Sequence, residues 1–369
     1  MWVKKMKIVC IDYSSPEYSG GVAQFTRNLI QALDCDIYTV SFFDGSFKWT
    51  SNSIHFGFPK IVFKIINRLT FYRLGAILVC LSLKWLKINS NDQLIINSPS
   101  FLRSKFIRNR YRFLLVHHQA WRVLYRNRAG YGGRRKFLGQ VLERAEAIVV
   151  LSKHEHSYLR RGWKKYERKF KFIPHCSKLK RMASAGSYST KNISMVCRLD
   201  NKQKRLDIAI DVISCLRDWK LNIYGKGRDR KFLEKMCKER QLKNVFFHGD
   251  VGNVEVAFPP GSIHLMTSDY EGFGLSNIEA LSAGIPVIVR NTFPAAAEIV
   301  KKNKNGILLP KNAQKSDYVR ELINVSKDYN YFSSGALESA AEYDISLFKT
   351  RWEKLLSAPY NEETKSNSE

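Results

Sequence analysis

Short apolar runs rich in β-branched and aromatic residues recur along the chain, and each is followed by a turn and a helix-like stretch. Continuous apolar runs, unlike alternating ones, are typical of strands that are covered on both faces. The repeated order of strand and helix therefore predicts a parallel α/β fold. The predicted strands are Lys7–Asp12, Ile37–Phe42, Leu94–Asn97, Phe113–Val116, Ala147–Leu151, Phe170–Pro174, Ile193–Leu199, Leu221–Tyr224, Val245–His248, Ile263–Thr267, Pro286–Val289 and Gly306–Leu309.

These twelve strands suit two sheets of six better than one large sheet. The polar stretch from Ser177 to Asn192 has no apolar periodicity and separates the two sets, as an inter-domain linker would. We therefore predict two Rossmann-like α/β domains that face each other across a cleft. The N-terminal domain is expected over residues 1–177 and the C-terminal domain over 178–345, and the final helix and tail, 346–369, are expected to return to the N-terminal domain.

Composition places the chain among globular proteins, but its charge is unusual. Hydrophobic residues make up 44% and charged residues 25% of the 369 residues, which excludes disordered and collagen-like classes. The formal net charge is +28, and residues 51–181, with 29 basic and 5 acidic side chains, supply +24 of it. A concentrated positive charge predicts a face that meets an anionic partner.

The sequence gives no sign of a disulfide framework or of a membrane span. Its seven cysteines have no zinc-type spacing and suit free thiols in a reducing cytosol. The first apolar run, Ile8 to Ile11, is too short for a signal peptide. The longest uncharged apolar run, Leu74 to Leu83, is too short to cross a bilayer, so we expect a cytoplasmic protein.

One segment of the basic region has the character of a membrane-surface helix. Phe58 to Lys87 mixes large apolar residues with six cations and no acidic residue. Such a segment can lie in the interface of an anionic membrane. Residues 103–136 add further positive charge that could meet lipid-linked phosphates. The alternative is a core helix with a solvated basic face; nucleic-acid binding is not expected, because no recognised module accompanies the charge.

The richest candidate site is the segment from Thr267 to Arg290. It predicts a strand end, a loop, a helix from about Ser276, and a stop at Gly284. Backbone N–H groups at such a helix start suit a diphosphate. Glu271 in the loop and Glu279 in the helix could both accept hydroxyl hydrogens of one ligand. The alternative is that Glu279 is a helix-surface charge and Glu271 a turn residue.

Residues 271–288, E-G-F-G-L-x3-E-A-L-x-A-G-x-P-V-I, resemble the signature of retaining GT-B glycosyltransferases, specifically glycosyltransferase family 4. The resemblance is strong over about residues 190–310 and weaker before them. It implies a GT-B fold and the transfer of a hexosyl unit from a nucleotide sugar, with a UDP-sugar as the favoured donor. The implied acceptor is a membrane-associated glycan in bacterial surface polysaccharide or lipopolysaccharide biosynthesis, on the cytoplasmic face of the inner membrane.

The resemblance also implies roles for individual residues. Arg198 and Lys204 match its Arg…Lys pair, with a spacing one residue longer than the commonest form. Two such cations can stabilise a departing nucleoside diphosphate, so neither a metal nor a cofactor is expected. Glu271 would hold hydroxyls of the donor sugar and Glu279 those of the ribose. The remaining donor-binding residues implied in this half are Gly249, Phe273, Gly274 and Leu275.

Two further candidates lie in the N-terminal half. Gly20 and Gly21 close the loop after the first strand, where a backbone can approach a ligand, although a plain turn is the alternative. His117 and His118 end a strand, and at that edge the resemblance implies a catalytic histidine, for which His117 is favoured. A metal pair is not expected, because adjacent strand residues point to opposite faces.

Other patterns have structural explanations. Asp34-Cys35-Asp36 has the form of a metal-binding D-x-D only by chance, and Ser152 with Glu155 predicts a capping box that explains His154 and His156. Gly225-Lys226-Gly227 is a weak signal. Two other functions stay open: a GT-B sugar-nucleotide epimerase, and a catalytically silent scaffold subunit at the membrane.

Overall fold

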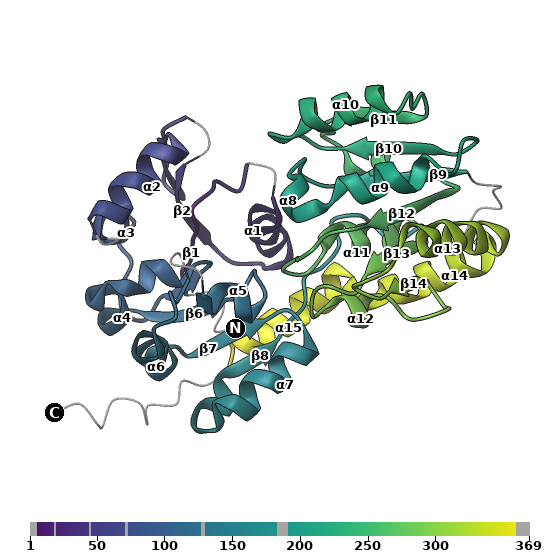
Figure 1. The fold of residues 1–369 in the computed structure, drawn as a ribbon. Coiled ribbons are helices and arrows are strands. Elements are labelled where there is room, and N and C mark those ends of the chain that lie inside the picture. The colour runs from purple at the N-terminus through teal and green to yellow at the C-terminus, as the bar shows by residue number, and fades with distance from the viewer. Residues whose placement is uncertain are drawn as a thin grey trace. The chain divides into compact units, whose positions relative to one another are not determined.

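The computed structural model describes residues 6–17, 20–43, 46–70, 73–126, 130–182 and 191–358. The chain divides into two compact units, each described here by itself (Figure 1). Unit 1 consists of Met1–Pro174 and Ile345–Glu369, and unit 2 of His175–Asp344. The predicted boundary at residue 177 lies three residues after this division, and part of the predicted linker falls outside the described residues.

In its described residues unit 1 is built on an eight-stranded sheet in the order β3-β4-β2-β1-β5-β6-β7-β8. All neighbouring strands are parallel except β3 and β4. The central strands are buried along their whole length, as their continuous apolar runs predict. The strands are β1 (Ile8–Ile11), β2 (Ile37–Phe43), β3 (Lys48–Trp49), β4 (Ser53–Phe58), β5 (Gln93–Ile96), β6 (Arg112–Val116), β7 (Ala147–Val150) and β8 (Phe170–Phe172).

The expectation of six strands in the first sheet is wrong, because β3 and β4 were missed. β4 has the sequence SIHFGF, in which polar Ser53 and His55 and the flexible Gly57 interrupt the apolar run. β3 is two residues long and exposed. These strands lie at the edge of the sheet, where burial on both faces no longer imposes a continuous apolar sequence.

The C-terminal helix belongs to unit 1, as predicted. In α15, Phe348 and Trp352 are buried and contact the ring of Phe25 in α1, at centroid distances of 6.2 and 5.6 Å. The helices of unit 1 are α1 (Gly21–Ala32), α2 (Lys60–Leu69), α3 (Arg73–Trp85), α4 (Lys105–Arg110), α5 (Trp121–Arg126), α6 (Arg135–Arg144), α7 (Lys153–Gly162) and α15 (Ile345–Leu356), with 3-10 turns at Pro99–Arg103 and Lys164–Lys169.

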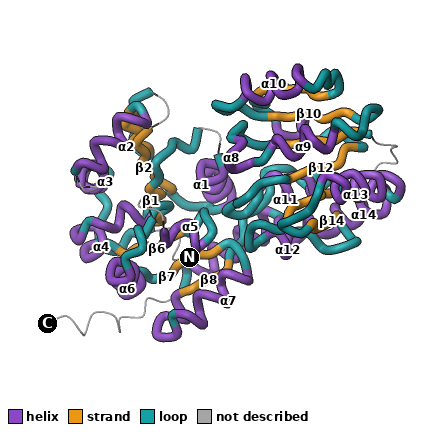
Figure 2. The backbone as a smooth tube through the Cα atoms, in the orientation of Figure 1, coloured by secondary structure: helices purple, strands orange, loops and turns teal. Residues whose placement is uncertain are grey.

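Unit 2 is a Rossmann-like layer of six parallel strands within the part that the structure describes, in the order β11-β10-β9-β12-β13-β14 (Figure 2). All six correspond to predicted strands: β9 (Asn192–Val196), β10 (Lys220–Tyr224), β11 (Val245–Gly249), β12 (Ser262–Met266), β13 (Val287–Arg290) and β14 (Gly306–Leu309). Its helices are α8 (Asn201–Lys204), α9 (Leu206–Ile213), α10 (Arg230–Glu239), α11 (Leu275–Ser282), α12 (Ala296–Ile299), α13 (Lys315–Lys327) and α14 (Tyr329–Ala340), with 3-10 turns at Val254–Ala257 and Ala341–Tyr343.

The predicted single helix over 58–87 is wrong: Phe58 ends β4, and α2 and α3 are separate helices. Among the described residues, no helix combines the length and the apolar character that crossing a membrane requires.

We expect Trp352→Ala to destabilise unit 1 by about 3–5 kcal/mol, because a large buried ring is replaced by a cavity. Trp352 is completely buried against α1, whereas Leu347 on the same helix is 42% exposed. The control Leu347→Ala should therefore change stability by less than about 0.5 kcal/mol. Urea unfolding followed by circular dichroism measures both, and similar losses in the two variants would contradict this account of α15.

Candidate functional site

The predicted site residues of unit 2 come together at the carboxyl edge of its sheet. Parallel strands end at the same edge, and in open α/β sheets ligands bind there. Arg198 lies in the loop after β9, Thr267 to Glu271 follow β12, and Arg290 ends β13. β9, β12 and β13 are neighbours in the sheet, so their loops meet.

Lys204 and Glu271, both singled out from the sequence, form an ion pair. Lys204 Nζ lies 2.5 Å from Glu271 Oε1, and the two side chains are only 13% and 10% exposed. Ser268 Oγ donates a second hydrogen bond to the same Oε1, at 2.7 Å. Thr267 Oγ1 donates to the backbone carbonyl of Lys204, at 2.8 Å. The loop after β12 therefore holds the ammonium and the carboxylate in one fixed arrangement.

Arg198 is exposed and is connected to the same loop through Gln203. Its Nη2 donates to Gln203 Oε1 at 3.3 Å, and Gln203 Nε2 donates to the carbonyl of Tyr270 at 3.1 Å. The backbone carbonyl of Gln203 accepts from the N–H of Asp269 at 2.8 Å. The exposed guanidinium of Arg198 is thus accessible to an anion, and its loop is held against the loop that carries Glu271.

Helix α11 begins one residue earlier than predicted, directly after Gly274. Gly274 is the N-cap, with a φ of 90° that favours glycine. The first N–H groups of a helix have no intrahelical acceptor, and those of Leu275 and Ser276 begin α11. An anion at this end would also meet the positive end of the helix dipole.

Two other predicted residues of this segment are buried. Glu279 is 6% exposed, so the alternative that it is a helix-surface charge is wrong. Phe273 is buried against the rings of His175 and Tyr343, at centroid distances of 5.4 and 6.0 Å. The Phe273 side chain therefore anchors the loop in unit 2, and its part in donor binding could come only through the backbone.

The weak Gly225-Lys226-Gly227 signal has a packing reason. A Cβ on Gly225 would lie 2.0 Å from the carbonyl oxygen of Cys197, and one on Gly227 2.2 Å from that of Leu199. The two glycines therefore allow the loop after β10 to lie against the loop that carries Arg198. Gly249 ends β11 with a φ of 78°, and its carbonyl accepts from the N–H of Gly225 at 2.6 Å.

A charged network that the sequence analysis missed supports the same loops. Asp269 accepts from Arg290 Nη1 at 2.5 Å and from Arg205 Nη1 at 3.5 Å. Arg205 also donates from Nε and Nη2 to Asp207, and Arg290 Nε donates to the carbonyl of Lys311. The available signal was positional: Asp269 lies two residues after one predicted strand and Arg290 directly after the next, at the edge where Arg198 was already expected.

Behind α11 lies a buried polar group that was also missed. His264 in β12 is within hydrogen-bond distance of the carbonyl of Ser194, at 3.0 Å, and of Ser276 Oγ, at 3.2 Å. Burial lowers its pKa to about 4, which keeps the ring neutral. Asn277 Nδ2 contacts Met266 Sδ at 3.2 Å, and within the described residues Asn277 Oδ1 is buried without a hydrogen-bond partner.

In unit 1, Gly20 is the N-cap of α1 with a φ of 144°, and α1 begins at Gly21. No described atom lies within 4 Å of the position that a Gly20 Cβ would take. The arrangement at these two glycines leaves the backbone accessible, as the sequence prediction requires; contact with a ligand stays a prediction.

The two histidines of unit 1 have different environments. His117 is 1% exposed, its Nε2 lies 3.0 Å from Tyr131 Oη, and burial lowers its pKa to about 3. His118 is partly exposed, and its Nε2 lies 2.8 Å from Asn97 Oδ1. A catalytic role for His117 stays a prediction, but in this structure His118 is the more accessible of the two.

The two patterns that the sequence analysis explained structurally, Asp34 to Asp36 and Ser152 to His156, lie outside the candidate site of unit 2. Ser152 Oγ accepts from the N–H of Glu155 at 3.1 Å and caps α7, which is one of the two bonds of the predicted capping box. Glu155 Oε1 accepts from the N–H of Trp121 at 2.5 Å. Asp34 to Asp36 connect α1 to β2. In the described part of the chain, His, Cys, Asp and Glu side chains do not gather in a group of three that could hold a metal ion.

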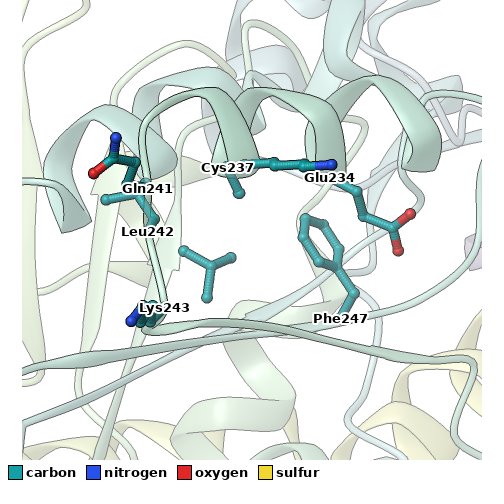
Figure 3. A pocket seen from close by; sticks show the side chains of 8 residues that line it. Glu234, Cys237, Gln241, Leu242, Lys243 and Phe247 are labelled. Atoms are coloured by element: carbon teal, nitrogen blue, oxygen red, sulfur yellow. The ribbon is translucent and has the colours of Figure 1, made fainter.

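A pocket of about 570 Å³ lies elsewhere in unit 2, between α10 and β11 (Figure 3). Its lining includes Glu234, Cys237, Leu242 and Phe247, and none of the residues predicted to bind the donor. β11 is the edge strand of the sheet, and β10 separates it from β9, β12 and β13, whose following loops carry the candidate site.

Comparisons with known proteins link unit 2 to glycosyltransferases. Residues 178–339 match the family model described as Glycosyl transferases group 1. The chain is 32% identical over 146 residues to the poly(glycerol-phosphate) alpha-glucosyltransferase of Bacillus subtilis, and the aligned stretch covers 38% of this chain and 21% of that protein. It is 28% identical over 163 residues to the poly(ribitol-phosphate) alpha-N-acetylglucosaminyltransferase of Staphylococcus aureus, covering 42% and 33%. The matched stretches thus span a third or less of the length of these two relatives.

Solved structures establish the fold over nearly the whole chain. The sucrose-phosphate synthase of Thermosynechococcus elongatus aligns with a TM-score of 0.74 and 17% identity, covering 95% of this chain and 98% of that one. A TarM variant of S. aureus in complex with UDP and other ligands aligns with a TM-score of 0.73 and 16% identity, covering 96% and 100%. Two Rossmann-like parallel-sheet units with these neighbours define the GT-B fold, as the sequence predicted.

We expect Gly274→Ala to destabilise unit 2 by about 1–3 kcal/mol, because its φ of 90° strains any residue with a Cβ. That Cβ would also lie 2.7 Å from Asn277 Nδ2. The control is Gly139→Ala inside α6, where no atom lies within 4 Å, and this change should stabilise by up to about 1 kcal/mol. Thermal unfolding measures both, and a neutral Gly274→Ala variant would refute the proposed strain.

We also expect stability to fall on mild acidification. Burial lowers the pKa of His117 and His175 to about 3 and that of His264 to about 4. Between about pH 6.5 and pH 4 the unfolded chain binds protons at these positions and the native chain does not, so stability decreases as pH falls. Each histidine contributes up to about 1.4 kcal/mol per pH unit.

Urea unfolding at about pH 7, 6 and 5 measures this dependence. His264→Asn removes one of the three groups and should lower the slope of stability against pH. The matched control is His154→Asn, because His154 is exposed in α7 and should leave the slope unchanged. Identical slopes for all three proteins would show that His264 does not contribute.

Proposed function

We propose that this protein is a glycosyltransferase that moves a hexosyl unit from a UDP-sugar to a glycan acceptor in the synthesis of a bacterial cell-surface polymer. The observation that carries the proposal is the ordered Lys204–Glu271 pair beside Arg198 and the first turn of α11. It combines cations and free N–H groups for a diphosphate with a carboxylate for sugar hydroxyls. A nucleotide sugar carries a diphosphate and sugar hydroxyls joined in one molecule, so it can meet all of these protein groups at once.

In this proposal the two cations bind the diphosphate. Lys204 keeps further N–H donors beyond the one that meets Glu271, and Arg198 offers a planar fork from its exposed position. Both cations would stabilise the negative charge that develops on the leaving nucleoside diphosphate. The supply of positive charge by the protein supports a reaction without metal or cofactor.

The carboxylates hold the sugars. Glu271 accepts hydroxyl hydrogens of the donor sugar with the lone pairs that Lys204 and Ser268 leave free, and Glu279 accepts those of the ribose. No protein nucleophile is required if the leaving group departs and the acceptor attacks on the same face of the sugar, with retention. The anomeric configuration of the product, followed by NMR from a donor of known configuration, tests this, and an inverted product would overturn it.

The relatives support the substrate class. Two of them are named for transfer to poly(glycerol-phosphate) and poly(ribitol-phosphate), and a third, 24% identical over 222 residues, is an amylovoran biosynthesis glycosyltransferase of Erwinia amylovora. Several structural neighbours are complexes with UDP. These names support a cell-surface polymer as the acceptor, and assembly at the cytoplasmic face of the membrane is part of the proposal.

An epimerase or a silent scaffold is supported less well. An epimerase would act without an acceptor and without a membrane surface, which leaves the strongly basic region of unit 1 unexplained. A silent subunit would not need to keep Lys204 and Glu271 as an ordered pair. A glycosyltransferase uses both features.

We expect UDP, among UDP, GDP, ADP and CMP, to raise the thermal stability of the protein selectively and equally well with EDTA present. Binding to the native state alone contributes about 2.7 kcal/mol at a hundredfold excess over Kd. Differential scanning fluorimetry measures the shift. Stabilisation that EDTA abolishes would contradict metal independence, and no shift with any nucleotide would favour the silent scaffold.

The double variant Lys204→Met with Glu271→Gln tests the site without leaving a charge unpaired. Loss of charge-assisted bonds of about 1.5–3 kcal/mol should weaken UDP binding roughly tenfold to a hundredfold. The matched control is Lys191→Met with Asp218→Asn, which removes an exposed ion pair elsewhere in unit 2. If both double variants bind UDP equally, the pair is not part of the donor site.

A further inference from the structure

Helices α2 and α3 expose large apolar side chains that the core of unit 1 does not use. Ile61 and Leu69 are 74% and 73% exposed, more than any other large apolar residue described in the chain. We call the exposed set the apolar face of α2 and α3. It consists of Ile61, Val62, Ile65, Ile66, Leu69, Ile77, Leu81 and Trp85.

The spacing of these residues places them in rows. Ile61, Ile65 and Leu69 recur every fourth residue of α2, and Ile77, Leu81 and Trp85 every fourth residue of α3. Residues four apart in a helix lie on one side of it. Each helix therefore carries an outward apolar row, which the alternative of a core helix with a solvated basic face does not account for.

The opposite sides of the helices fasten them to the unit. Phe63 of α2 and Val79 and Leu83 of α3 are fully buried in the core of unit 1. Asn67, also buried, accepts a hydrogen bond from the N–H of Gly75 at 3.0 Å and ties the two helices together. The helices pack near β2 at one end of the unit, as Figure 1 shows. The apolar face is thus presented by a fixed structure.

Aromatic residues continue the surface beyond α3. The ring of Trp85 meets that of Trp49 edge-on at 5.1 Å, and Phe47 lies 5.9 Å from Trp49. All three rings are exposed. Tryptophan has an apolar body with a polar N–H and is typical of the boundary between lipid and water.

The charge around this surface is mostly positive, and the exposed Glu17 pairs with Lys48 of β3. Between residues 46 and 140 the sequence contains one acidic residue, Asp92, which is buried and accepts backbone hydrogen bonds from Lys7 and Asn89. Lys60 begins α2, Lys84 lies in the last turn of α3, and Lys87 follows it, all exposed. An occupant of the apolar face must therefore be apolar with negative charge at its boundary.

We propose that α2 and α3 lie in the interface of an anionic lipid bilayer, with the apolar face in the acyl boundary and the lysines at the headgroups. Burial of apolar side chains and attraction to anionic lipid add in such an interface. A second copy of this chain fits less well, because the same cations would be brought against each other. This inference does not rest on the proposed activity, which concerns residues of unit 2.

The test is co-sedimentation of the full chain with vesicles of phosphatidylcholine, alone or mixed with phosphatidylglycerol, at low and high salt. We expect binding to the mixed vesicles. The variant Ile61→Ser/Ile65→Ser/Leu69→Ser should lower the partition coefficient at least about tenfold at both salt concentrations, since apolar burial is not screened. Lys60→Gln with Lys84→Gln should lower it about fivefold per charge, at low salt only.

The matched control is Ile30→Ser, because Ile30 is an exposed apolar residue of α1 outside the apolar face, and it should leave binding unchanged. Stabilisation by UDP, measured in parallel, should be the same in every variant. A chain that stays in solution with all vesicles, or an oligomer that the triple variant dissociates, would overturn the proposal. Vesicle binding without any UDP effect would instead refute the proposed function and leave this inference intact.

Discussion

The buried parallel strand is the constraint on which both units depend. A strand covered on both faces carries mainly apolar side chains along its length, and ligands are bound where such strands end. In unit 2, β12 is buried throughout, and the next residues are Thr267, Ser268 and Asp269, which hold the loops of the site together. Burial of the strands on both faces therefore places the polar side chains of the candidate site mainly in the loops at the edge of the sheet.

The Lys204–Glu271 pair shows how such an edge is prepared for an anion. A lysine and a carboxylate that are each about nine-tenths buried must compensate each other, because an isolated charge at that depth would be strongly disfavoured. Ser268 adds a hydrogen bond to the Glu271 carboxylate, Thr267 bonds the backbone carbonyl of Lys204, and Asp269 joins the loop to two arginines. A ligand with opposite charges at matching positions finds these groups already oriented, which reduces the entropic cost of binding.

Unit 1 has a different surface property. Its core ends at the inner sides of α2 and α3, and the outer sides carry apolar rows that water does not favour. Most of the strongly positive stretch 51–181, up to Pro174, belongs to the same unit as these apolar rows. Under the two proposals made above, unit 2 would bind the soluble nucleotide sugar and unit 1 the membrane surface.

The sequence by itself determined twelve of the strands, the two-unit plan and the segment around Glu271, because apolar continuity and a long motif are local properties. It did not determine the edge strand β3 and its neighbour β4, whose half-exposed sequences carry no continuous apolar signal. Tertiary structure alone decided that Lys204 meets Glu271 across 67 positions of sequence, that Arg205 and Arg290 share Asp269, and that His117 is buried against Tyr131. It also decided which residues of α2 face the core and which stay exposed, because this depends on what the rest of the chain packs against the helix.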